Sequence, residues 1–164
     1  TKFYILMDYN IIAKSYNELY EEEQIKKLKI IEQHIKVKKN DKLLDIGCGT
    51  GISTNYFKCK SIGIDNSKEM IKNGKGNLIL AKAEYLPFKD KIFDIILCIT
   101  SIHNFKNPKK ALKEILRVKK SKAQVVITLL KKSKNYKVLK KMIKSSFKVK
   151  ELDEDKDTIF ISSN

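Results

Sequence analysis

The segment LLDIGCGTG, Leu43–Gly51, constrains the fold of this chain more than any other segment, because an apolar run leads directly into three closely spaced glycines. A short run rich in Leu and Ile is typical of a buried strand, and the glycines allow a tight turn into a helix. A strand, a glycine-rich turn and a helix in this order form a ligand site at the carboxyl end of the strand. The segment therefore predicts an α/β fold with its binding site at this turn.

Strands and helices are expected to alternate along the rest of the chain. Apolar runs predict strands at 42–46, 61–65, 78–82, 93–99 and 123–130, and apolar residues at helical spacing predict helices at 51–58, 67–74, 107–120 and 134–146. Residues from about 11 to 36 predict one or two helices before the first strand. The segments 147–152 and 158–163 predict a closing hairpin. This order indicates a mostly parallel sheet with helices on both faces.

The chain carries a formal net charge of +16, and nearly all of the positive charge is lysine because Arg117 is the only arginine. A charge of this size is compatible with a nucleic-acid partner. It is also compatible with a lysine-rich composition, since arginine is the usual residue for bidentate phosphate contacts. The charge is denser from Lys106 to Lys150, which favours a basic surface with a function. Both interpretations remain open.

Cysteine and histidine are too few and too scattered for a structural metal site. The sequence has three cysteines, without a CxxC pair, and two histidines, so we expect no metal, no disulfide framework and a cytoplasmic location. No apolar run reaches the roughly 18–20 residues that a membrane span requires, and we expect no membrane contact. The apolar residues near the N-terminus are interrupted by Asp8 and are too few for a signal peptide.

Two carboxylates indicate the ligand of the glycine-rich turn. Asp45 ends the first strand, where it would repel a pyrophosphate and favour a ligand with a cationic centre. Asp65 ends the next strand, 20 positions further on, where an acid can accept hydrogen bonds from two ribose hydroxyls. The glycine spacing departs from the dinucleotide fingerprint by one residue, and no Gly-Lys-Ser/Thr follows as in a P-loop. S-adenosylmethionine, a nucleoside joined to a cationic amino acid, fits this pattern.

The sequence resembles the class I S-adenosylmethionine-dependent methyltransferases of type 11, the group that includes the ubiquinone-biosynthesis-type enzymes. LLDIGCGTG matches the first motif of the family, and GIDNS, Gly63–Ser67, matches the second. The segment Ala83–Phe105 resembles the family's AExLPF…FD segment and the loop after its fourth strand, and NPKKALKEILRVKK resembles the helix that follows. DYNIIAKSYNELY, Asp8–Tyr20, is similar to the IAxxYD segment that often begins such chains.

This resemblance implies a Rossmann-like three-layer sandwich, with a mostly parallel seven-stranded sheet, an antiparallel C-terminal hairpin strand and N-terminal helices. It implies a single methyltransferase domain over 1–164, in which 1–40 forms a helical lid segment and 41–164 the Rossmann-like core. The implied cofactor is S-adenosylmethionine, with S-adenosylhomocysteine as the product.

The family's binding roles carry over to matching positions of this sequence. The expected cofactor contacts are Gly47, Gly49 and Gly51 at the methionine moiety with Cys48 in the same turn, Asp45 near the ammonium, Asp65 at the ribose, Asn66, Ala83 and Glu84 at the adenine, and Cys98 and Ile99 at the amino-acid end. Tyr16 is a candidate to close over the site, against plain helix packing. His103 is a candidate near the transferred methyl group, against an ordinary loop histidine.

Two positions depart from the family pattern. Lys82 stands where many relatives have an aspartate bonded to the adenine amino group, and an ammonium group cannot accept that hydrogen bond. Residues 119–123, KKSKA, replace a Leu-Lys-Pro-Gly-Gly turn, and we interpret them as a variant loop.

The sequence offers little to cover the methyl group apart from its N-terminal helices, so we expect an open site. An open, basic site favours RNA or an RNA-associated protein as the methyl acceptor, and it favours a partner subunit or a homodimer that completes the pocket. Two alternatives stay open: a small-molecule methyltransferase with the N-terminal helices as its lid, and a non-catalytic subunit that binds the cofactor or nucleic acid. A nicotinamide oxidoreductase is disfavoured by the glycine spacing.

Overall fold

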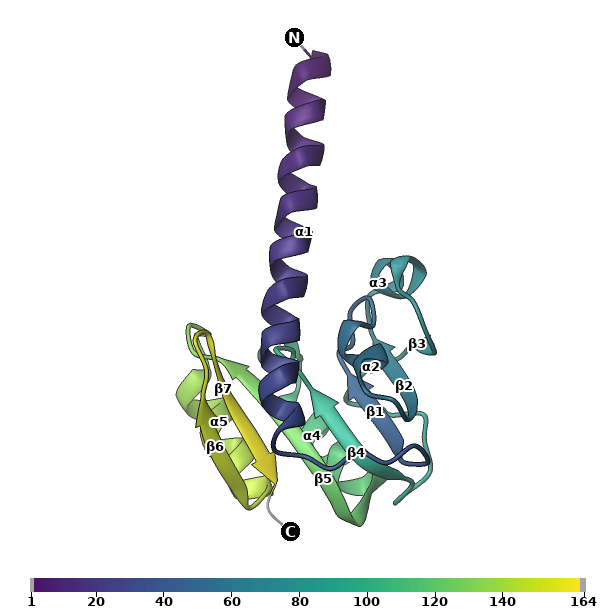
Figure 1. Ribbon diagram of the computed structural model, residues 1–164. Helices are drawn as coiled ribbons and strands as arrows, with labels where there is room; N and C mark the ends of the chain where they lie inside the picture. The colour runs from purple at the N-terminus through teal and green to yellow at the C-terminus, as the bar shows by residue number, and fades with distance from the viewer. Residues whose placement is uncertain (1, 163–164) are drawn as a thin grey trace.

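The computed structural model describes the backbone of residues 2–162 and the side-chain surroundings of residues 17–162. Its centre is a seven-stranded sheet in the order β3-β2-β1-β4-β5-β7-β6 (Figure 1). The strands are β1 (Lys42–Ile46), β2 (Lys60–Asp65), β3 (Leu78–Leu80), β4 (Phe93–Cys98), β5 (Lys119–Leu130), β6 (Val149–Asp153) and β7 (Asp157–Ser162). The predicted Rossmann-like three-layer fold is confirmed.

The first five strands are parallel, and β7 of the C-terminal hairpin is antiparallel to them, as predicted. β1 pairs with β2 on one side and with β4 on the other, and β5 pairs with β7 in the opposite direction. Leu130, the last residue of β5, pairs with Asp157, the first residue of β7. The beginning of β7 therefore lies at the same edge of the sheet as the carboxyl ends of the parallel strands.

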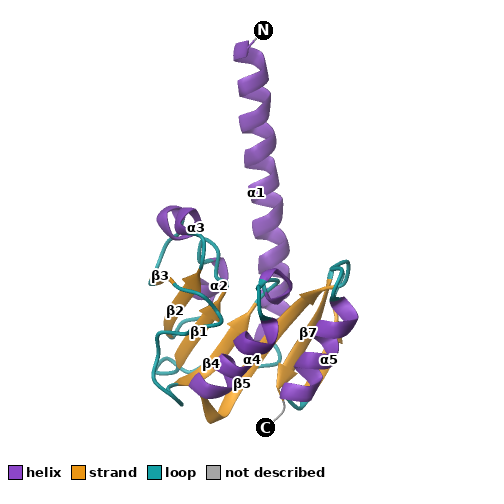
Figure 2. Ribbon diagram, turned by 180° about the vertical axis from the view of Figure 1, so that it is seen from behind, coloured by secondary structure: helices purple, strands orange, loops and turns teal. Residues whose placement is uncertain are grey.

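Helices cover both faces of the sheet. They are α1 (Lys2–Glu32), α2 (Ile52–Tyr56), α3 (Lys68–Asn73), a 3-10 turn η1 (Ile102–Asn104), α4 (Pro108–Val118) and α5 (Tyr136–Ser146). The C-terminal turns of α1 lie in front of the sheet in Figure 1, and α4 and α5 lie in front of it when it is seen from behind in Figure 2. The N-terminal helical segment is thus one helix.

Alternation along the central strands creates two separate apolar cores, as expected for side chains that point to opposite faces of a sheet. On one face, Leu43 of β1 packs in a cluster with Leu28 and Ile31 of α1. On the other face, Leu44 packs in a cluster with residues of α4 and α5 that include Ile115. The packing of α1 is therefore limited to its C-terminal turns among the residues whose side chains are described.

Local signals position the shorter helices. Ser67 is the N-cap of α3, where its side chain accepts a hydrogen bond from the Met70 amide at 3.2 Å, as predicted. Asn107 caps α4, whose first turn contains Pro108.

The interpretation of residues 119–123 as a loop was wrong. α4 ends at Val118, and Lys119 already begins β5, which pairs with Phe93 of β4 across a register shift. The lysines are tolerated in this strand because residues 120–122 are exposed to solvent. Lys120 also forms an ion pair with Asp94 at 2.7 Å.

In the part of the chain that the structure describes, we find no helix with the length and apolarity needed to cross a bilayer.

Candidate functional site

A cavity of about 520 Å³ lies at the carboxyl edge of the sheet, within the size range of small-molecule sites. The loops after β1, β2, β3 and β4 all contribute to its wall. The residues that line it are Tyr20, Gly47, Gly49, Ile64, Asp65, Asn66, Ser67, Met70, Ala81, Lys82, Ala83, Glu84, Tyr85, Ile99, Thr100, Ser101, Asn104, Phe105, Lys106, Asn107 and Lys110. The predicted cofactor segments therefore meet at one place.

The glycine-rich loop forms the floor of this cavity. Gly47 has φ 72°, and a Cβ atom there would come within 2.5 Å of the Ser101 Cβ, so the two loops touch without room for a side chain. Ser101 Oγ donates a hydrogen bond to the Gly47 carbonyl at 3.1 Å. Gly49 has φ 55°, but a Cβ there would meet no atom within 4 Å because the residue faces open space. A ligand can thus approach the backbone at Gly49.

Asp65 lies in the wall of the cavity and is held by two backbone amides. Its Oδ2 accepts a hydrogen bond from Gly49 N at 2.9 Å, and its Oδ1 accepts one from Ser67 N at 2.8 Å. A carboxylate has about four acceptor positions, so each oxygen retains a lone pair. The fixed carboxylate can accept hydrogen bonds from two neighbouring hydroxyl groups of a ligand.

Asp45 is fully buried beneath the glycine-rich loop. Its Oδ2 accepts hydrogen bonds from Ser53 Oγ at 2.6 Å and Thr54 Oγ1 at 2.7 Å, which ties β1 to the first turn of α2. Burial raises the pKa of Asp45 to about 6, although the two hydroxyls oppose this shift. Among the described side chains, none bonds to its Oδ1. Asp45 is absent from the cavity wall as described, so it lies behind the site rather than in it.

Lysines and aromatic rings surround the end of the cavity where the adenine was predicted. Ala83, Glu84 and Asn66 line this end, as does Lys82. Glu84 Oε1 accepts a hydrogen bond from Asn107 N at 3.1 Å, so its carboxylate is already partly engaged in joining two loops. Lys110 Nζ lies 3.2 Å from the centroid of the Tyr85 ring, where the cation and the ring attract one another.

The remaining predicted cofactor residues divide into one that lines the cavity and three that do not. Ile99 lines it. Gly51 instead lines a neighbouring pocket with Thr50, and Cys48 and Cys98 line neither pocket.

Burial raises the pKa of Cys48 to about 12, and it raises the pKa of the fully buried Cys98 as well. Both cysteines are therefore uncharged packing residues, and the structure offers neither as a nucleophile.

Neither of the two candidate catalytic residues, Tyr16 and His103, is found in the described wall of the cavity. The side chain of Tyr16 lies outside the described residues, whereas Tyr20, one helical turn further along α1, lines the cavity. His103 is half-buried, and it is absent from the described cavity wall. Burial lowers its pKa, with Asp157 opposing and Lys27 reinforcing the shift, so the imidazole is neutral at pH 7. His103 is therefore influenced by the charges of Lys27 and Asp157, and its buried Nδ1 has no hydrogen-bond partner among the described residues.

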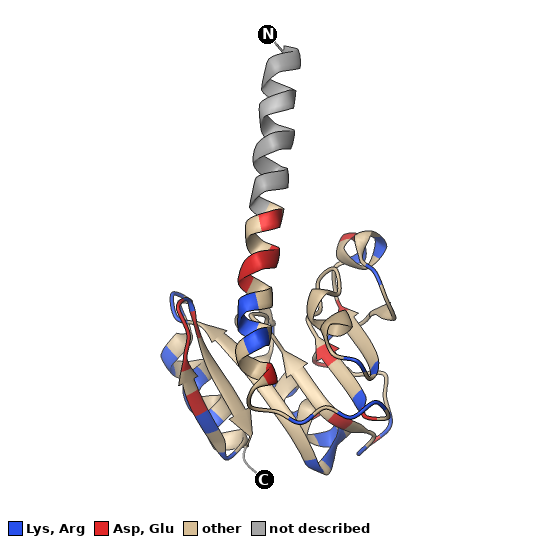
Figure 3. Ribbon diagram, viewed as in Figure 1, with Lys and Arg blue, Asp and Glu red and all other residues tan. Residues whose placement is uncertain are grey.

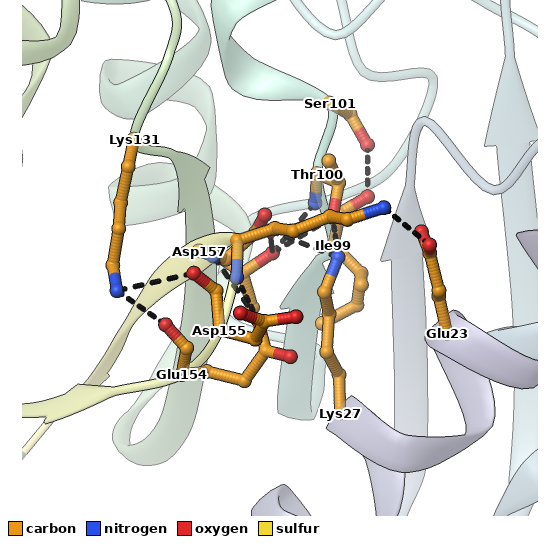
Figure 4. A network of polar contacts seen from close by, with 11 residues as sticks. Glu23, Lys27, Ile99, Thr100, Ser101, Lys131, Glu154, Asp155 and Asp157 are labelled. Carbon is orange, nitrogen blue, oxygen red and sulfur yellow. Dashed lines mark hydrogen bonds and ion pairs between the residues drawn. The ribbon is translucent and has the colours of Figure 1, made fainter.

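A buried polar cluster was missed by the sequence analysis. It contains Lys27 of α1, Thr100 of the loop after β4, Thr128 of β5 and Asp157 of β7 (Figure 4). One signal was available, because Lys27 lies four and eight positions before Ile31 and Ile35 and so shares the apolar face of the helix predicted there. Asp157 gave none, since it belongs to an acidic turn that looks like ordinary solvent-exposed sequence.

The fold and the site together define a Rossmann-like domain with a cavity at the carboxyl edge of its sheet. The model of the family described as "Methyltransferase domain" matches residues 44–127, which is half of the chain. The chain belongs to this family, the class I S-adenosylmethionine-dependent methyltransferases of type 11.

Two curated relatives are similar to this chain. The uncharacterized protein MJ1252 of Methanocaldococcus jannaschii is 35% identical over 147 residues, which cover 85% of this chain and 57% of that protein. The demethylmenaquinone methyltransferase of Thermotoga maritima is 33% identical over 97 residues, covering 53% of this chain and 42% of that enzyme. This chain thus spans about half the length of the curated relatives it matches.

A solved structure shares the fold. The S-adenosylmethionine-dependent methyltransferase of Aquifex aeolicus superposes with a TM-score of 0.66 at 18% identity, covering 82% of this chain and 87% of that chain.

The described residues fit the cofactor of this family. Asp65 offers two acceptor positions for the ribose hydroxyls, and Gly49 leaves its backbone open to the methionine moiety. The unbonded Oδ1 of the buried Asp45 matches the cofactor's need for a nearby negative charge beside its ammonium group.

Proposed function

We propose that this chain transfers the methyl group of S-adenosylmethionine to a nucleophilic atom of an acceptor by in-line displacement. The observation that carries the proposal is the carboxylate of Asp65, which two backbone amides fix in the cavity wall beside Gly49. Such a carboxylate selects vicinal hydroxyls, and the acid behind the glycine-rich loop disfavours a pyrophosphate.

The residues of the chain contribute binding, orientation and exclusion of water. The cofactor supplies an intrinsically reactive sulfonium methyl group, so holding donor and acceptor in line is the main requirement. The hydrogen bond between Ser101 and Gly47 fixes the loop after β4 against the glycine-rich loop. A base is needed only for an acceptor that arrives protonated, and the neutral His103 is the candidate for that role.

We propose RNA or an RNA-associated protein as the acceptor. Lys82, Lys106 and Lys110 line the cavity, and Figure 3 shows further basic residues on α4 and α5. The net charge of +16 supports the same acceptor class. The exposed Tyr85 adds a ring on which a base can stack. A partner subunit or a second copy of the chain would complete the open side of such a site.

A small-molecule acceptor is the second candidate. Tyr20 of α1 lines the cavity, so this helix already contributes to the cover that a small substrate requires. The name of the Thermotoga relative denotes a quinone as its substrate, which supports this alternative. A subunit that binds the cofactor without transferring its methyl group is the third candidate.

Calorimetry tests which cofactor the protein binds. We expect S-adenosylmethionine to bind and NADH not to bind under the same conditions. Binding of NADH without binding of S-adenosylmethionine would contradict the proposal.

Labelling of a cell extract identifies the acceptor class. The extract is incubated with the protein and tritiated S-adenosylmethionine, and the labelled fraction is then treated with nuclease or protease. Loss of label to nuclease supports RNA, and loss to protease supports a protein. Label that resists both and passes an ultrafiltration membrane supports a small molecule, whereas cofactor binding without any labelling supports the non-catalytic subunit.

A further inference from the structure

The most unusual group of side chains beside the cofactor cavity is a buried cluster in which Lys27, Thr100 and Asp157 (Figure 4) bond to one another and to Thr128. Its ion pair joins Lys27 Nζ to Asp157 Oδ2 at 3.2 Å, and the two side chains are 3% and 0% exposed. Removing two charges from water is costly, and a pair of apolar side chains in the same space is often equally or more stable. Stability alone therefore does not explain this pair.

The hydrogen bonds of the cluster converge on Thr100. Lys27 Nζ donates to Thr100 Oγ1 at 3.0 Å, and Thr100 Oγ1 donates to Asp157 Oδ2 at 2.7 Å. The Thr100 amide donates to Thr128 Oγ1 at 2.7 Å, and Thr128 Oγ1 in turn donates to Asp157 Oδ2 at 2.8 Å. The amide and the hydroxyl of Thr100 are thus both held by the cluster.

The backbone of Thr100 is strained. Its φ of 50° lies in the left-handed region, which is unfavourable for a β-branched residue. Such a conformation persists when the surrounding structure imposes it, and it occurs preferentially at functional sites. Thr100 and its neighbours Ile99 and Ser101 line the cofactor cavity, and Ser101 also contacts the glycine-rich loop. The cluster therefore sets the conformation of a segment that lies in the wall of the site.

The same cluster anchors helix α1. Tyr20, Glu23 and Lys27 lie three and four positions apart, so they share one face of the helix. Tyr20 lines the cavity, Glu23 forms an ion pair with Lys156, the residue before β7, and Lys27 enters the buried cluster. This face of α1 thus contacts the cavity and the start of β7 together.

We propose that Lys27 and Asp157 are positioning residues, which hold Thr100 and the adjoining cavity wall in the geometry required for methyl transfer and make that geometry depend on the docking of α1. This inference rests on the proposed methyltransferase function and extends it to residues outside the cofactor contacts. Lys27 and Asp157 act through Thr100 and need not touch the cofactor or the acceptor.

The double variant Lys27→Met/Asp157→Asn tests the proposal. It removes both charges, so no unpaired charge stays buried, and the asparagine side chain can still accept hydrogen bonds from the two threonines. The matched control is Lys29→Met/Asp155→Asn, which makes the same changes at exposed positions of α1 and of the turn before β7. Thermal unfolding of both variants establishes that they are folded.

Two measurements decide the result. At saturating tritiated S-adenosylmethionine, with the extract fraction that the unaltered protein labels, we expect Lys27→Met/Asp157→Asn to transfer methyl groups at least tenfold more slowly than the control. We expect its dissociation constant for S-adenosylmethionine, measured by calorimetry, to stay within threefold of the control. A transfer rate within twofold of the control, or an equal loss of rate and affinity, overturns the proposal.

Amide hydrogen exchange provides a readout that is independent of activity. The Thr100 amide should exchange at least tenfold faster in the double variant, because the two charges that hold the Thr100 and Thr128 hydroxyls against each other are removed. Unchanged exchange at Thr100 overturns the inference even if the cofactor binds. Failure of the unaltered protein to bind S-adenosylmethionine contradicts the proposed function instead.

Thr128→Val serves as a second variant if the double variant does not fold. Valine has nearly the same shape but accepts no hydrogen bond from the Thr100 amide, and the ion pair stays intact. The same separation of transfer rate from cofactor affinity is expected.

Discussion

Asp45 and Asp157 are both fully buried carboxylates near the same edge of the sheet, yet the chain surrounds them with different partners. Asp45 receives two hydroxyl groups, and burial raises its pKa to about 6. Asp157 receives two hydroxyl groups and the ammonium group of Lys27. One carboxylate thus has its cation supplied by the chain itself. Asp45 has no cationic partner among the described residues. A carboxylate in this state can interact with the cationic group of a ligand.

This difference separates two halves of the site. The half around Asp45 and Asp65 is formed by segments close in sequence, and we assign it to the methyl donor. The half around Thr100 and Asp157 is formed by α1, β5, β7 and the loop after β4, and we assign it to the geometry of transfer.

The largest effect is expected from Lys27→Met, which leaves the buried Asp157 without its cation. Breaking a buried ion pair by removing one partner typically lowers the free energy of unfolding by about 3–5 kcal/mol. Urea unfolding measures the change, with Lys29→Met as the exposed control on the same helix. A loss below about 1 kcal/mol, the level of a surface pair, would mean that water reaches the cluster.

Asp45→Asn should have the opposite effect on the cofactor-free protein. The folded pKa of Asp45, about 6, lies above its ordinary value of 3.8, so its contribution to stability is present below pH 3.8 and is lost as the pH rises through 6. The difference between these values corresponds to about 3 kcal/mol. We therefore expect the variant and the unaltered protein to unfold alike near pH 4, and the variant to be more stable at pH 7.5. Urea unfolding at both pH values checks this, and a variant that is less stable at pH 7.5 would contradict it.

Asp65→Ala tests the third carboxylate of this region, which lines the cavity. Loss of its charge-assisted hydrogen bonds to the ribose should weaken S-adenosylmethionine binding by about 1–3 kcal/mol. Calorimetry measures the affinity, and Asp155→Ala, at an exposed position, provides the control. Unchanged affinity would show that the ribose lies elsewhere.

The smallest effect concerns the pH dependence of cofactor affinity. The cofactor's ammonium group favours the ionised form of Asp45, so lowering the pH from 7 to 5 should weaken binding about tenfold, given the folded pKa of about 6. The Asp45→Asn variant should lack this dependence. Equal pH dependence in both proteins would assign the titration to another group.

Much of the donor half could be predicted because its chemistry is local. Gly49 and Ser67 hold Asp65 through amides only 16 and 2 positions away, and the cap of α3 depends on a serine three residues before the bonded amide. Residues 119–123 were assigned to a loop because they replace a turn of the family pattern, whereas in the structure they belong to β5, where Lys119 pairs with Phe93 of β4.

Distance along the chain explains what the sequence could not predict. Thr100 bonds to Lys27 and Asp157 across 73 and 57 positions, and no motif or periodicity connects the three. Of the predicted pair, His103 is absent from the described cavity wall, the side chain of Tyr16 lies outside the described residues, and the described cavity residue of α1 is Tyr20.

The sequence by itself determined the parallel sheet, the glycine-rich turn and the acid at the end of β2, since apolar periodicity, backbone freedom at glycine and helix capping act within a few residues. Only the tertiary structure decided that Asp157, and not Asp45, forms a buried ion pair with a lysine. The antiparallel direction of β7 brings Asp157 to the carboxyl edge of the sheet, and the packing of Leu28 and Ile31 against that sheet buries Lys27 beside it.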